Sequence, residues 1–423
     1  TNDAKNRSHY PVRISFSPII APLISTVLFM LGSGYLTTFI SIRMSESGHS
    51  DQAIGMVASA FYIGLVIGGF QISKLIVKIG HLRVFTIFVG IFNTVCLLHI
   101  LSDNVYLWFV LRFIAGMALS GFYITVESWL LECSNATNRG TTLGLYMIAL
   151  STAQAFSQLL LQKYKVMSLY PFIIITTLLS LSIIPVAVAK NKKAQDHEIE
   201  LVSLSSLSKV ASSSLAICLV SGLFLSVIYS LLPVFFNGLT EDSEKTSYLM
   251  FATMIGGMLI QYPVGLLSDN FDRRKVMIGV SVFLVGILSY SIFVGFSNMS
   301  FMSLMAVSFL LGGMGFIFYP MALSMVCDNL RSANVVSVTQ KLSMVEGVGA
   351  IMGPIIAPLF IYYFGTKGLS IYFITATACL VAFLTLRVSQ KERVSNNSFS
   401  MAVHTTPILA ELDPRSDEDE EEV

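Results

Sequence analysis

The sequence predicts an all-α membrane protein with twelve transmembrane helices in two pseudo-symmetric six-helix halves. Of its 423 residues, 54% are hydrophobic and only 12% are charged, which excludes a water-soluble domain. Apolar runs of about 20 residues recur along almost the whole chain, and a helix of that length crosses a hydrocarbon core of roughly 30 Å. The runs are continuous rather than alternating, which disfavours a β-barrel.

Each apolar run is long enough to form one membrane-spanning helix. The predicted spans cover residues 17–42, 53–72, 84–101, 106–130, 140–162, 171–189, 213–236, 248–267, 276–297, 301–327, 334–363 and 370–388. A polar segment precedes the first run and no small-residue cleavage site follows it, so we expect this run to remain as the insertion signal.

The longest polar interior stretch divides the spans into six and six. The predicted regions are a cytosolic N-terminal segment (1–16), the first half (17–189), a cytosolic linker (190–212), the second half (213–388) and a disordered acidic cytosolic tail (389–423). The tail ends in LDPRSDEDEEEV, which is strongly acidic and has few apolar residues, so it is predicted to be disordered.

The distribution of Lys and Arg predicts the orientation of the chain. With the N-terminus in the cytosol, 20 of the 26 cationic residues fall in cytosolic segments. Cytoplasmic loops of membrane proteins carry an excess of Lys and Arg, so both termini are assigned to the cytosol. We expect a multi-pass monomer in the cytoplasmic (inner) membrane of a bacterium, in contact with the lipid bilayer and with no nucleic acid.

Two pairs of segments repeat across the halves. The stretch FQISKLIVKIGHLRVF (70–85) has the outline of QYPVGLLSDNFDRRKV (261–276), with a cationic loop between two apolar runs. Similarly, FIAGMALSGFY (113–123) returns as FLLGGMGFIFY (309–319). Paired six-helix halves are the internal repeat typical of transporters that rock about a site at the membrane midplane.

The second cationic loop resembles a known signature. GLLSDNFDRRKV (265–276) is similar to the motif Gly, then Asp-Arg-x-Gly-Arg-Arg, that follows the second span of a half in the major facilitator superfamily. Asp269 stands at the acidic position of that motif. Asn270 replaces the first Arg of the pattern, and Asp272 replaces its Gly.

Further segments support the same resemblance. LRFIAG (111–116) is similar to the fourth-span motif of the superfamily, with Arg112 as its Arg, and RGTTLGLYM (139–147) is similar to the opening of its fifth span. GHLRVF (80–85) and VESWLLE (126–132) resemble the YcaD-like branch. The resemblance implies a secondary transporter that moves a small solute.

Charged residues at the cytosolic helix ends are predicted to form a gate. The gate residues are Asp269, Arg273, Arg274, Lys78, Arg83, Glu132 and Arg139. Asp269 is expected to accept bonds from helix N-termini and guanidinium groups when the cytosolic side is shut. The first loop has Val77 at the acidic position, and Glu132 is expected to act in its place. The alternative is that both loops only set the topology.

Glu346 is the deepest carboxylate in the chain. It follows Ala333 by 13 residues, or roughly 20 Å along a helix. An unpaired charge at a helix centre costs at least about 2.5–3.5 kcal/mol, so we expect Glu346 to couple transport to protons or to contact the solute. The alternative is a structural pairing with Lys341. Arg112 has the same two interpretations, and Glu127 is either a cavity group or part of the gate.

Polar and aromatic residues within the spans are candidates for the solute cavity. Spans 1, 4, 7 and 10, which hold the tyrosines, line the cavity in the superfamily that the chain resembles, and glutamines of spans 5 and 8 are expected to contribute. The candidates are Tyr35, Tyr123, Tyr229, Tyr319, Gln154, Gln158 and Gln261. Tyr and Gln side chains in spans also join helices through hydrogen bonds, and the sequence leaves both interpretations open for each.

The predicted function is secondary active transport of a small organic solute by alternating access, coupled to protons. No Gly-x-x-x-x-Gly-Lys loop for nucleotides, catalytic set or metal cluster appears, so we expect no enzyme activity, cofactor or metal. Few cations lie within the spans, which favours hydrophobic or amphipathic solutes. The sequence does not decide the direction of transport, import or export, or whether the coupling ion is a proton or sodium. The alternative is a sensor or scaffold that has a transporter fold but does not transport.

Overall fold

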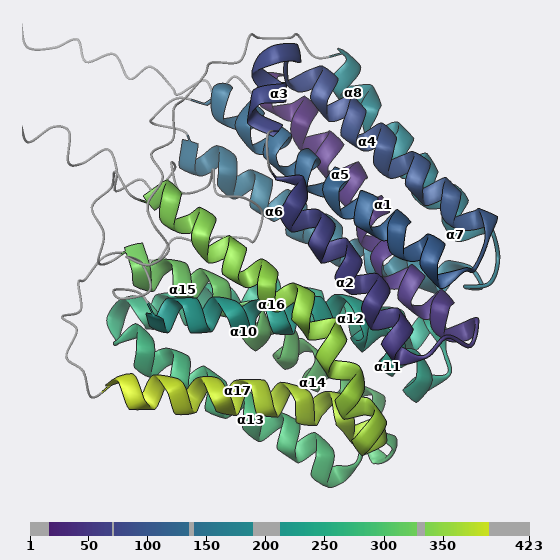
Figure 1. Ribbon diagram of the computed structural model, residues 1–423. Helices are drawn as coiled ribbons and strands as arrows, with labels where there is room; N and C mark the ends of the chain where they lie inside the picture. The colour runs from purple at the N-terminus through teal and green to yellow at the C-terminus, as the bar shows by residue number, and fades with distance from the viewer. Residues whose placement is uncertain (1–16, 70–71, 135–138, 189–211, 328–334, 389–423) are drawn as a thin grey trace, which may run out of the picture.

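The computed structural model describes five stretches of the chain. These are residues 17–69, 72–134, 139–188, 212–327 and 335–388. The predicted N-terminal segment and the tail lie outside them, as does all but the last residue of the linker. Every regular element in the described stretches is a helix, so the predicted all-α membrane fold is confirmed (Figure 1).

The first half is built from eight α-helices and two short 3₁₀ turns in the described residues. They are α1 (Ser17–Glu46), α2 (Asp51–Gly68), α3 (Ile72–Ile79), α4 (His81–Leu98), η1 (His99–Leu101), α5 (Val105–Glu132), α6 (Arg139–Gln158), η2 (Leu159–Lys163), α7 (Tyr170–Leu181) and α8 (Ile183–Val188). Side-chain caps fix two of the starts: Ser50 accepts the Ala53 N–H, and Asn104 accepts the Tyr106 N–H. Gly80, with φ +83°, separates α3 from α4.

The second half follows the same plan. Its elements are α10 (Ser212–Ser230), α11 (Leu232–Thr240), α12 (Ser243–Asn270), α13 (Arg273–Val294), η3 (Phe296–Asn298), α14 (Phe301–Gly315), α15 (Phe318–Cys327), α16 (Val335–Phe364), η5 (Gly365–Lys367) and α17 (Gly368–Val388). Asp272 is the N-cap of α13, where its Oδ1 accepts the Arg274 N–H at 2.9 Å. Asp272 departs from the superfamily pattern, and its role as a helix cap explains an acidic residue at this position.

The predicted spans agree with the helices. Each span overlaps one helix or two consecutive helices, and eleven described stretches are long and apolar enough to cross a membrane. The last stretch, Thr339–Leu386, contains both α16 and α17. The seventh span breaks between α10 and α11, where Pro233 lacks the backbone N–H that would continue the helix.

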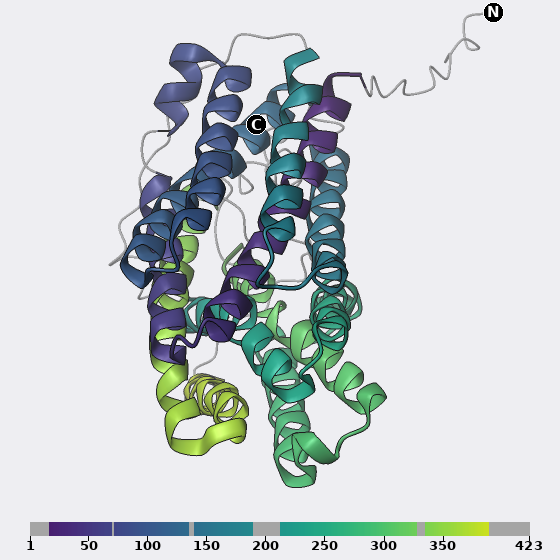
Figure 2. The same cartoon turned by 90° about the vertical axis from the view of Figure 1, so that its right-hand side faces the viewer.

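The two halves form separate bundles that converge at one end. In the first half α5 packs against α2 and α4, and in the second half α10 packs against α16 while α12 packs against α14. The halves meet along α2 and α16 and along α6 and α12. Figure 1 shows the bundles close together near α2, α11 and α12 and apart toward α3 and α15, and Figure 2 shows the two bundles from the side.

Hydrogen bonds join the halves at the converging end. Asn237 Nδ2 of α11 donates to Glu46 Oε1 of α1 at 3.4 Å. Ser247 Oγ of α12 donates to the backbone carbonyl of Gln158 in α6 at 2.8 Å. These four residues lie at the helix ends opposite the loop that carries Asp269. The bundle is therefore closed at that end.

Candidate functional site

A cavity of about 620 Å³ lies between the two halves. Helices α1, α2, α5 and α6 contribute to its wall from the first half, and α10, α12 and α16 contribute from the second. Most of the wall is made of aromatic, methionine and aliphatic side chains, with a small number of Ser, Thr, Gln and Glu residues among them. This volume and lining suit a drug-sized organic molecule, because ligand pockets measure about 300–1,000 Å³.

The cavity extends toward the end of the bundle where the halves diverge. Its wall includes Gly69, which follows α2, and Gln261, near the end of α12. Gln340, near the start of α16, also belongs to the wall. These helix ends are on the side of the loop that carries Asp269. The cavity thus extends toward the side that the Lys and Arg distribution assigns to the cytosol.

Glu346 lies on the cavity wall in α16, with only 8% of its surface exposed. Its Oε1 accepts a hydrogen bond of 2.8 Å from Ser221 Oγ of α10. The side chain also interacts electrostatically with Tyr62 of α2 and with Cys218 of α10. Lys341 precedes it by five residues, which places the two side chains on different faces of the helix. The acid is therefore bound to the neighbouring helix and faces both halves.

Three tyrosines from both halves form a cluster near Glu346, which we call the tyrosine cluster: Tyr62 of α2, Tyr123 of α5 and Tyr229 of α10. All three line the cavity, so their rings face one space from three helices. The Tyr229 ring meets the edge of Phe316 with centroids 5.9 Å apart. The sequence pointed to Tyr123 and Tyr229 but missed Tyr62, because span 2 was not expected to reach the cavity.

Two glutamines expected in the cavity are on its wall. Gln154 comes from α6 and Gln261 from α12. Gln261 Nε2 donates to the Phe316 carbonyl at 3.3 Å, and its buried Oε1 has no hydrogen-bond partner among the described residues. An unsatisfied buried acceptor is costly, so this oxygen is a position for a donor from a bound molecule.

Three other candidates are absent from the described cavity wall. Tyr35 is fully buried within the first half, where its ring packs beside Phe39 with centroids 5.8 Å apart. Gln158 Oε1 accepts a hydrogen bond of 2.7 Å from Thr38 and so joins α6 to α1.

Tyr319, the third of these, is 2% exposed. Its hydroxyl lies 2.8 Å from Ser343 Oγ, which links α15 to α16. Ser343 itself is a wall residue, so Tyr319 reaches the cavity only through that partner.

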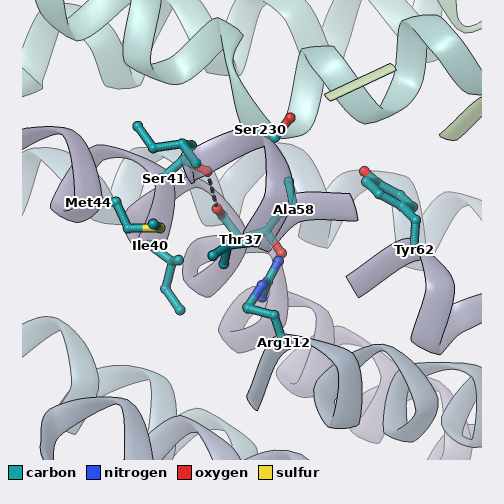
Figure 3. A pocket seen from close by; sticks show the side chains of 10 residues that line it. Thr37, Ile40, Ser41, Met44, Ala58, Tyr62, Arg112 and Ser230 are labelled. Atoms are coloured by element: carbon teal, nitrogen blue, oxygen red, sulfur yellow. Dashed lines mark hydrogen bonds between the residues drawn. The ribbon is translucent and has the colours of Figure 1, made fainter. Parts of the chain in front are cut away.

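Arg112 lies in a small pocket beside the cavity and is 3% exposed. Its guanidinium carbon is 4.2 Å from the centroid of the Phe61 ring, and its Nη1 has no hydrogen-bond partner among the described residues. Figure 3 shows the guanidinium pointing toward Thr37 and Ala58. Thr37 and Tyr62 line both this pocket and the large cavity, so the two spaces are neighbours.

Glu127 is completely buried in α5, behind the cavity wall. Its Oε1 accepts a hydrogen bond of 3.4 Å from Tyr146 of α6. It also interacts electrostatically with Tyr123, which is a wall residue. Glu127 is not among the described wall residues, and both of its roles stay predictions.

The second-half loop contains a short ionic network. Asp269 Oδ1 lies 3.4 Å from Arg273 Nη2, and Arg273 Nη1 donates to Ser268 Oγ at 3.0 Å. These contacts join the end of α12 to the start of α13. Arg274 follows at the capped start of α13.

In the first half, the acid of the corresponding region is Glu132. It lies 3.7 Å from His81 Nδ1, and His81 Nε2 contacts Ser128 Oγ at 2.7 Å. Lys78 and Arg83 are exposed, and Arg139 starts α6. The sequence did not identify His81 as the partner of Glu132, since that pairing depends on how α4 packs against α5.

Known proteins resemble this chain over most of its length. The family profile of the Major Facilitator Superfamily matches residues 23–245 and 215–412. One relative is the uncharacterized MFS-type transporter YcaD of Escherichia coli, which is 28% identical over 343 residues, or 80% of this chain and 87% of YcaD.

Solved structures share the fold. The nucleoside transporter NupG superposes with a TM-score of 0.71 at 16% identity, over 88% of this chain and 98% of NupG. A bacterial homolog of the human lysosomal transporter Spinster, in an inward-facing and occupied conformation, gives 0.72 at 11% identity, over 88% and 96% of the two chains. A D-xylose-proton symporter gives 0.69 at 11% identity, over 87% and 97%.

Proposed function

We propose that this chain, which belongs to the major facilitator superfamily and is a transporter, moves a small organic solute by alternating access in exchange or together with protons. The observation that carries the proposal is Glu346, the acidic residue of the cavity wall among the described residues. It lies between the two halves, where a change in its charge acts on both. The fold shared with NupG and the D-xylose-proton symporter, which by their names move small solutes, supports this function.

Alternating access requires an end that opens and an end that closes. The contacts of Asn237 with Glu46 and of Ser247 with Gln158 hold one end shut. Rocking the halves about the cavity would break these contacts and bring together the loops at the other end, including that of Asp269. The Asp269–Arg273 pair of that loop joins a partly exposed carboxylate to a buried guanidinium and already lies within one half, so the closing contacts would be new ones between the loops.

Proton coupling follows from the environment of Glu346. A charged group at the centre of a span costs at least about 2.5–3.5 kcal/mol, and protonation removes that charge. Ser221 of α10 donates to the carboxylate, and the negative charge of Glu346 acts on Tyr62 of α2 and Cys218 of α10. Binding or release of one proton therefore changes the electrostatics at the boundary of the two halves.

The orientation is part of the proposal. The excess of cations in the loops near Asp269 supports a cytosolic location for that side. The cavity would then be open to the cytosol in this conformation, and the end closed by Asn237 and Glu46 would face the outside. A monomer in the cytoplasmic membrane of a bacterium is consistent with the relative in Escherichia coli.

The test is a solute screen in proteoliposomes that contain a pH-sensitive dye. A solute that the protein carries should produce proton movement, and Glu346→Gln should reduce the initial rate at least about tenfold because the amide cannot bind the proton. Glu346→Asp, which keeps an acid, should retain part of the rate. The matched control is Glu244→Gln, at an exposed position in the first turn of α12.

One result would contradict proton coupling through Glu346. It is a Glu346→Gln protein that carries the same solute with the same proton movement and the same pH dependence as the unmodified chain.

A further inference from the structure

We infer that the solute is a monovalent organic cation with an aromatic or other apolar body, whose positive charge is held between Glu346 and the tyrosine cluster. This inference rests on the proposed function, because it takes the central cavity as the solute site. Three features of the cavity support it: the sign of its charge, the arrangement of its aromatic rings, and the composition of the remaining wall.

The charge of the wall selects against anions. Among its described residues, the wall has the carboxylate of Glu346 and no Lys, Arg or His. An anionic solute would meet this acid without a compensating cation, and a buried charge without a partner is costly. A cationic solute instead gains the attraction of the Glu346 carboxylate inside an apolar cavity, where charge-assisted contacts are strong.

Arg112 does not reverse this selection. It lines the small pocket beside the cavity and is not among the described wall residues. Its guanidinium lies against the Phe61 ring, and Tyr62 separates the two spaces as a residue of both walls. Arg112 also acts electrostatically on Tyr62, so its charge reaches the tyrosine cluster from outside the wall, whereas Glu346 is the charged residue on the described wall itself.

The aromatic rings provide a second contact for a positive charge. The negative face of a tyrosine ring attracts a cation within about 6 Å of its centroid. Tyr62, Tyr123, Tyr229 and Glu346 all line this cavity, so the rings and the acid face the same space. Because Tyr62 and Tyr123 belong to the first half and Tyr229 and Glu346 to the second, a cation bound here contacts both moving bodies.

The rest of the wall fits the body of such a solute. Four methionines, Met30, Met254, Met258 and Met344, line the cavity from three sides of the bundle together with Phe316. Thioether side chains are flexible and polarizable, so they adapt to apolar bodies of different shape. A cavity of about 620 Å³ accommodates a molecule with several rings.

The Gln261 Oε1 atom adds a specific acceptor. It is buried on the wall and has no hydrogen-bond partner among the described residues. A protonated amine can donate to this oxygen, whereas a quaternary ammonium or phosphonium cannot. Protonated amines are therefore expected to bind with an additional contact.

The test compares two ions of the same shape and opposite charge. Tetraphenylphosphonium and tetraphenylborate are titrated into the full-length protein in lipid nanodiscs, with binding followed by calorimetry and empty nanodiscs subtracted. Tetraphenylphosphonium should bind at one saturable site and tetraphenylborate should not. Glu346→Gln should weaken phosphonium binding about 10- to 100-fold, because the positive charge loses its electrostatic attraction to the carboxylate. Glu346→Asp should retain more affinity, and Glu244→Gln should equal the unmodified chain.

A second pair of variants separates the ring from the hydroxyl. Tyr62→Phe keeps the aromatic face and should change phosphonium affinity less than about twofold, whereas Tyr62→Leu should lower it by about 2- to 30-fold. Thermal unfolding of each variant in detergent shows whether it is folded. If both variants change phosphonium affinity equally, the Tyr62 ring does not contact the bound cation.

Two results would overturn the assignment of a cationic solute. One is tetraphenylborate binding as tightly as tetraphenylphosphonium, and the other is a Glu346→Gln affinity for phosphonium within twofold of the unmodified chain. The measurement needs no gradient, so it is independent of proton coupling. A protein that moves protons with a neutral solute but fails this test keeps the proposed function. A protein that binds phosphonium through Glu346 but moves no protons keeps the cationic solute and loses only the proton coupling of the proposed function.

Discussion

The two halves present different chemistry to the cavity from similar scaffolds. A Ser-Gly pair occurs at residues 33–34 of α1 and again at residues 221–222 of α10. The glycine of the first pair packs against α6, the glycine of the second pair packs against α16, and both of these helices line the cavity. The residue that meets the first pair is Gln154 of α6, and the residue that meets the second is Glu346 of α16. Both line the cavity. The halves thus share their packing, while only the second half places an acid at this position.

The cationic loops differ in the same way. Val77 of the first loop is 44% exposed, whereas Asp269 of the second loop is paired with Arg273. In the first half the acid comes instead from the end of α5, where Glu132 contacts His81. The two halves therefore share their helix packing but differ in their polar groups. Closely packed helix contacts tolerate few changes of side chain.

The largest expected effect on transport comes from removing the acid of the second half and placing one in the first half instead. Glu346→Gln makes the two halves chemically alike and should lower solute-linked proton movement at least about tenfold, since no carboxylate remains on the described wall. Adding Gln154→Glu to that variant places an acid in the first half at the same cavity. We expect this double variant to recover part of the proton movement, measured with the internal pH dye in proteoliposomes.

The control for this relocation is Gln154→Glu alone, which adds a second acid to the wall. If the double variant is as inactive as Glu346→Gln, the two positions are not interchangeable, and the function of Glu346 depends on contacts of the second half such as Ser221.

A smaller effect is expected at the glycines of the two pairs. A Cβ at Gly222 would overlap the backbone carbonyl of Glu346, whereas a Cβ at Gly34 would meet side-chain atoms, including Gln154 Oε1 at 2.9 Å. Side chains can rotate away and backbone cannot, so Gly222→Ala should destabilise by about 1–3 kcal/mol and Gly34→Ala by less. Thermal unfolding in detergent measures both, and the reverse order would contradict the contacts described for α10 and α16.

The smallest effect is expected at the loops. Asp269→Asn removes the charge that Arg273 contacts, and a partly exposed ion pair contributes about 0–1 kcal/mol, so the initial transport rate should change at most about fivefold. Val77→Ala should leave the rate within about twofold, because Val77 is exposed and makes no ionic contact. If Asp269→Asn and Val77→Ala change the initial rate equally, the charged loops only set the orientation of the chain in the membrane.

Much of the fold was predictable because hydropathy reports on spans directly. The predicted spans agree with the described helices within a few residues at most ends, whereas α3 lies in the stretch that the sequence presented as a cationic loop. The depth of Glu346 was also readable from its distance to the start of its span. Asp272, by contrast, was noted only as a departure from a motif, and its role as the cap of α13 required the structure.

The candidate site was only partly predictable. Gln154 and Gln261 reach the cavity, whereas Tyr35 and Gln158 pack within the first half, and Tyr62 was missed. In a helix bundle within lipid, the faces toward lipid and toward other helices are both apolar. Periodicity therefore carries little information about which face of a span lines the cavity.

The sequence by itself determined the class of protein, the positions of the spans and the presence of one deep acid, because burial of about 20 apolar residues depends only on local composition. The tertiary structure decided which side chains meet. Glu346, Tyr62 and Tyr229 come from three helices and two halves, and only the rotation and packing of those helices bring an acid and aromatic rings into one cavity.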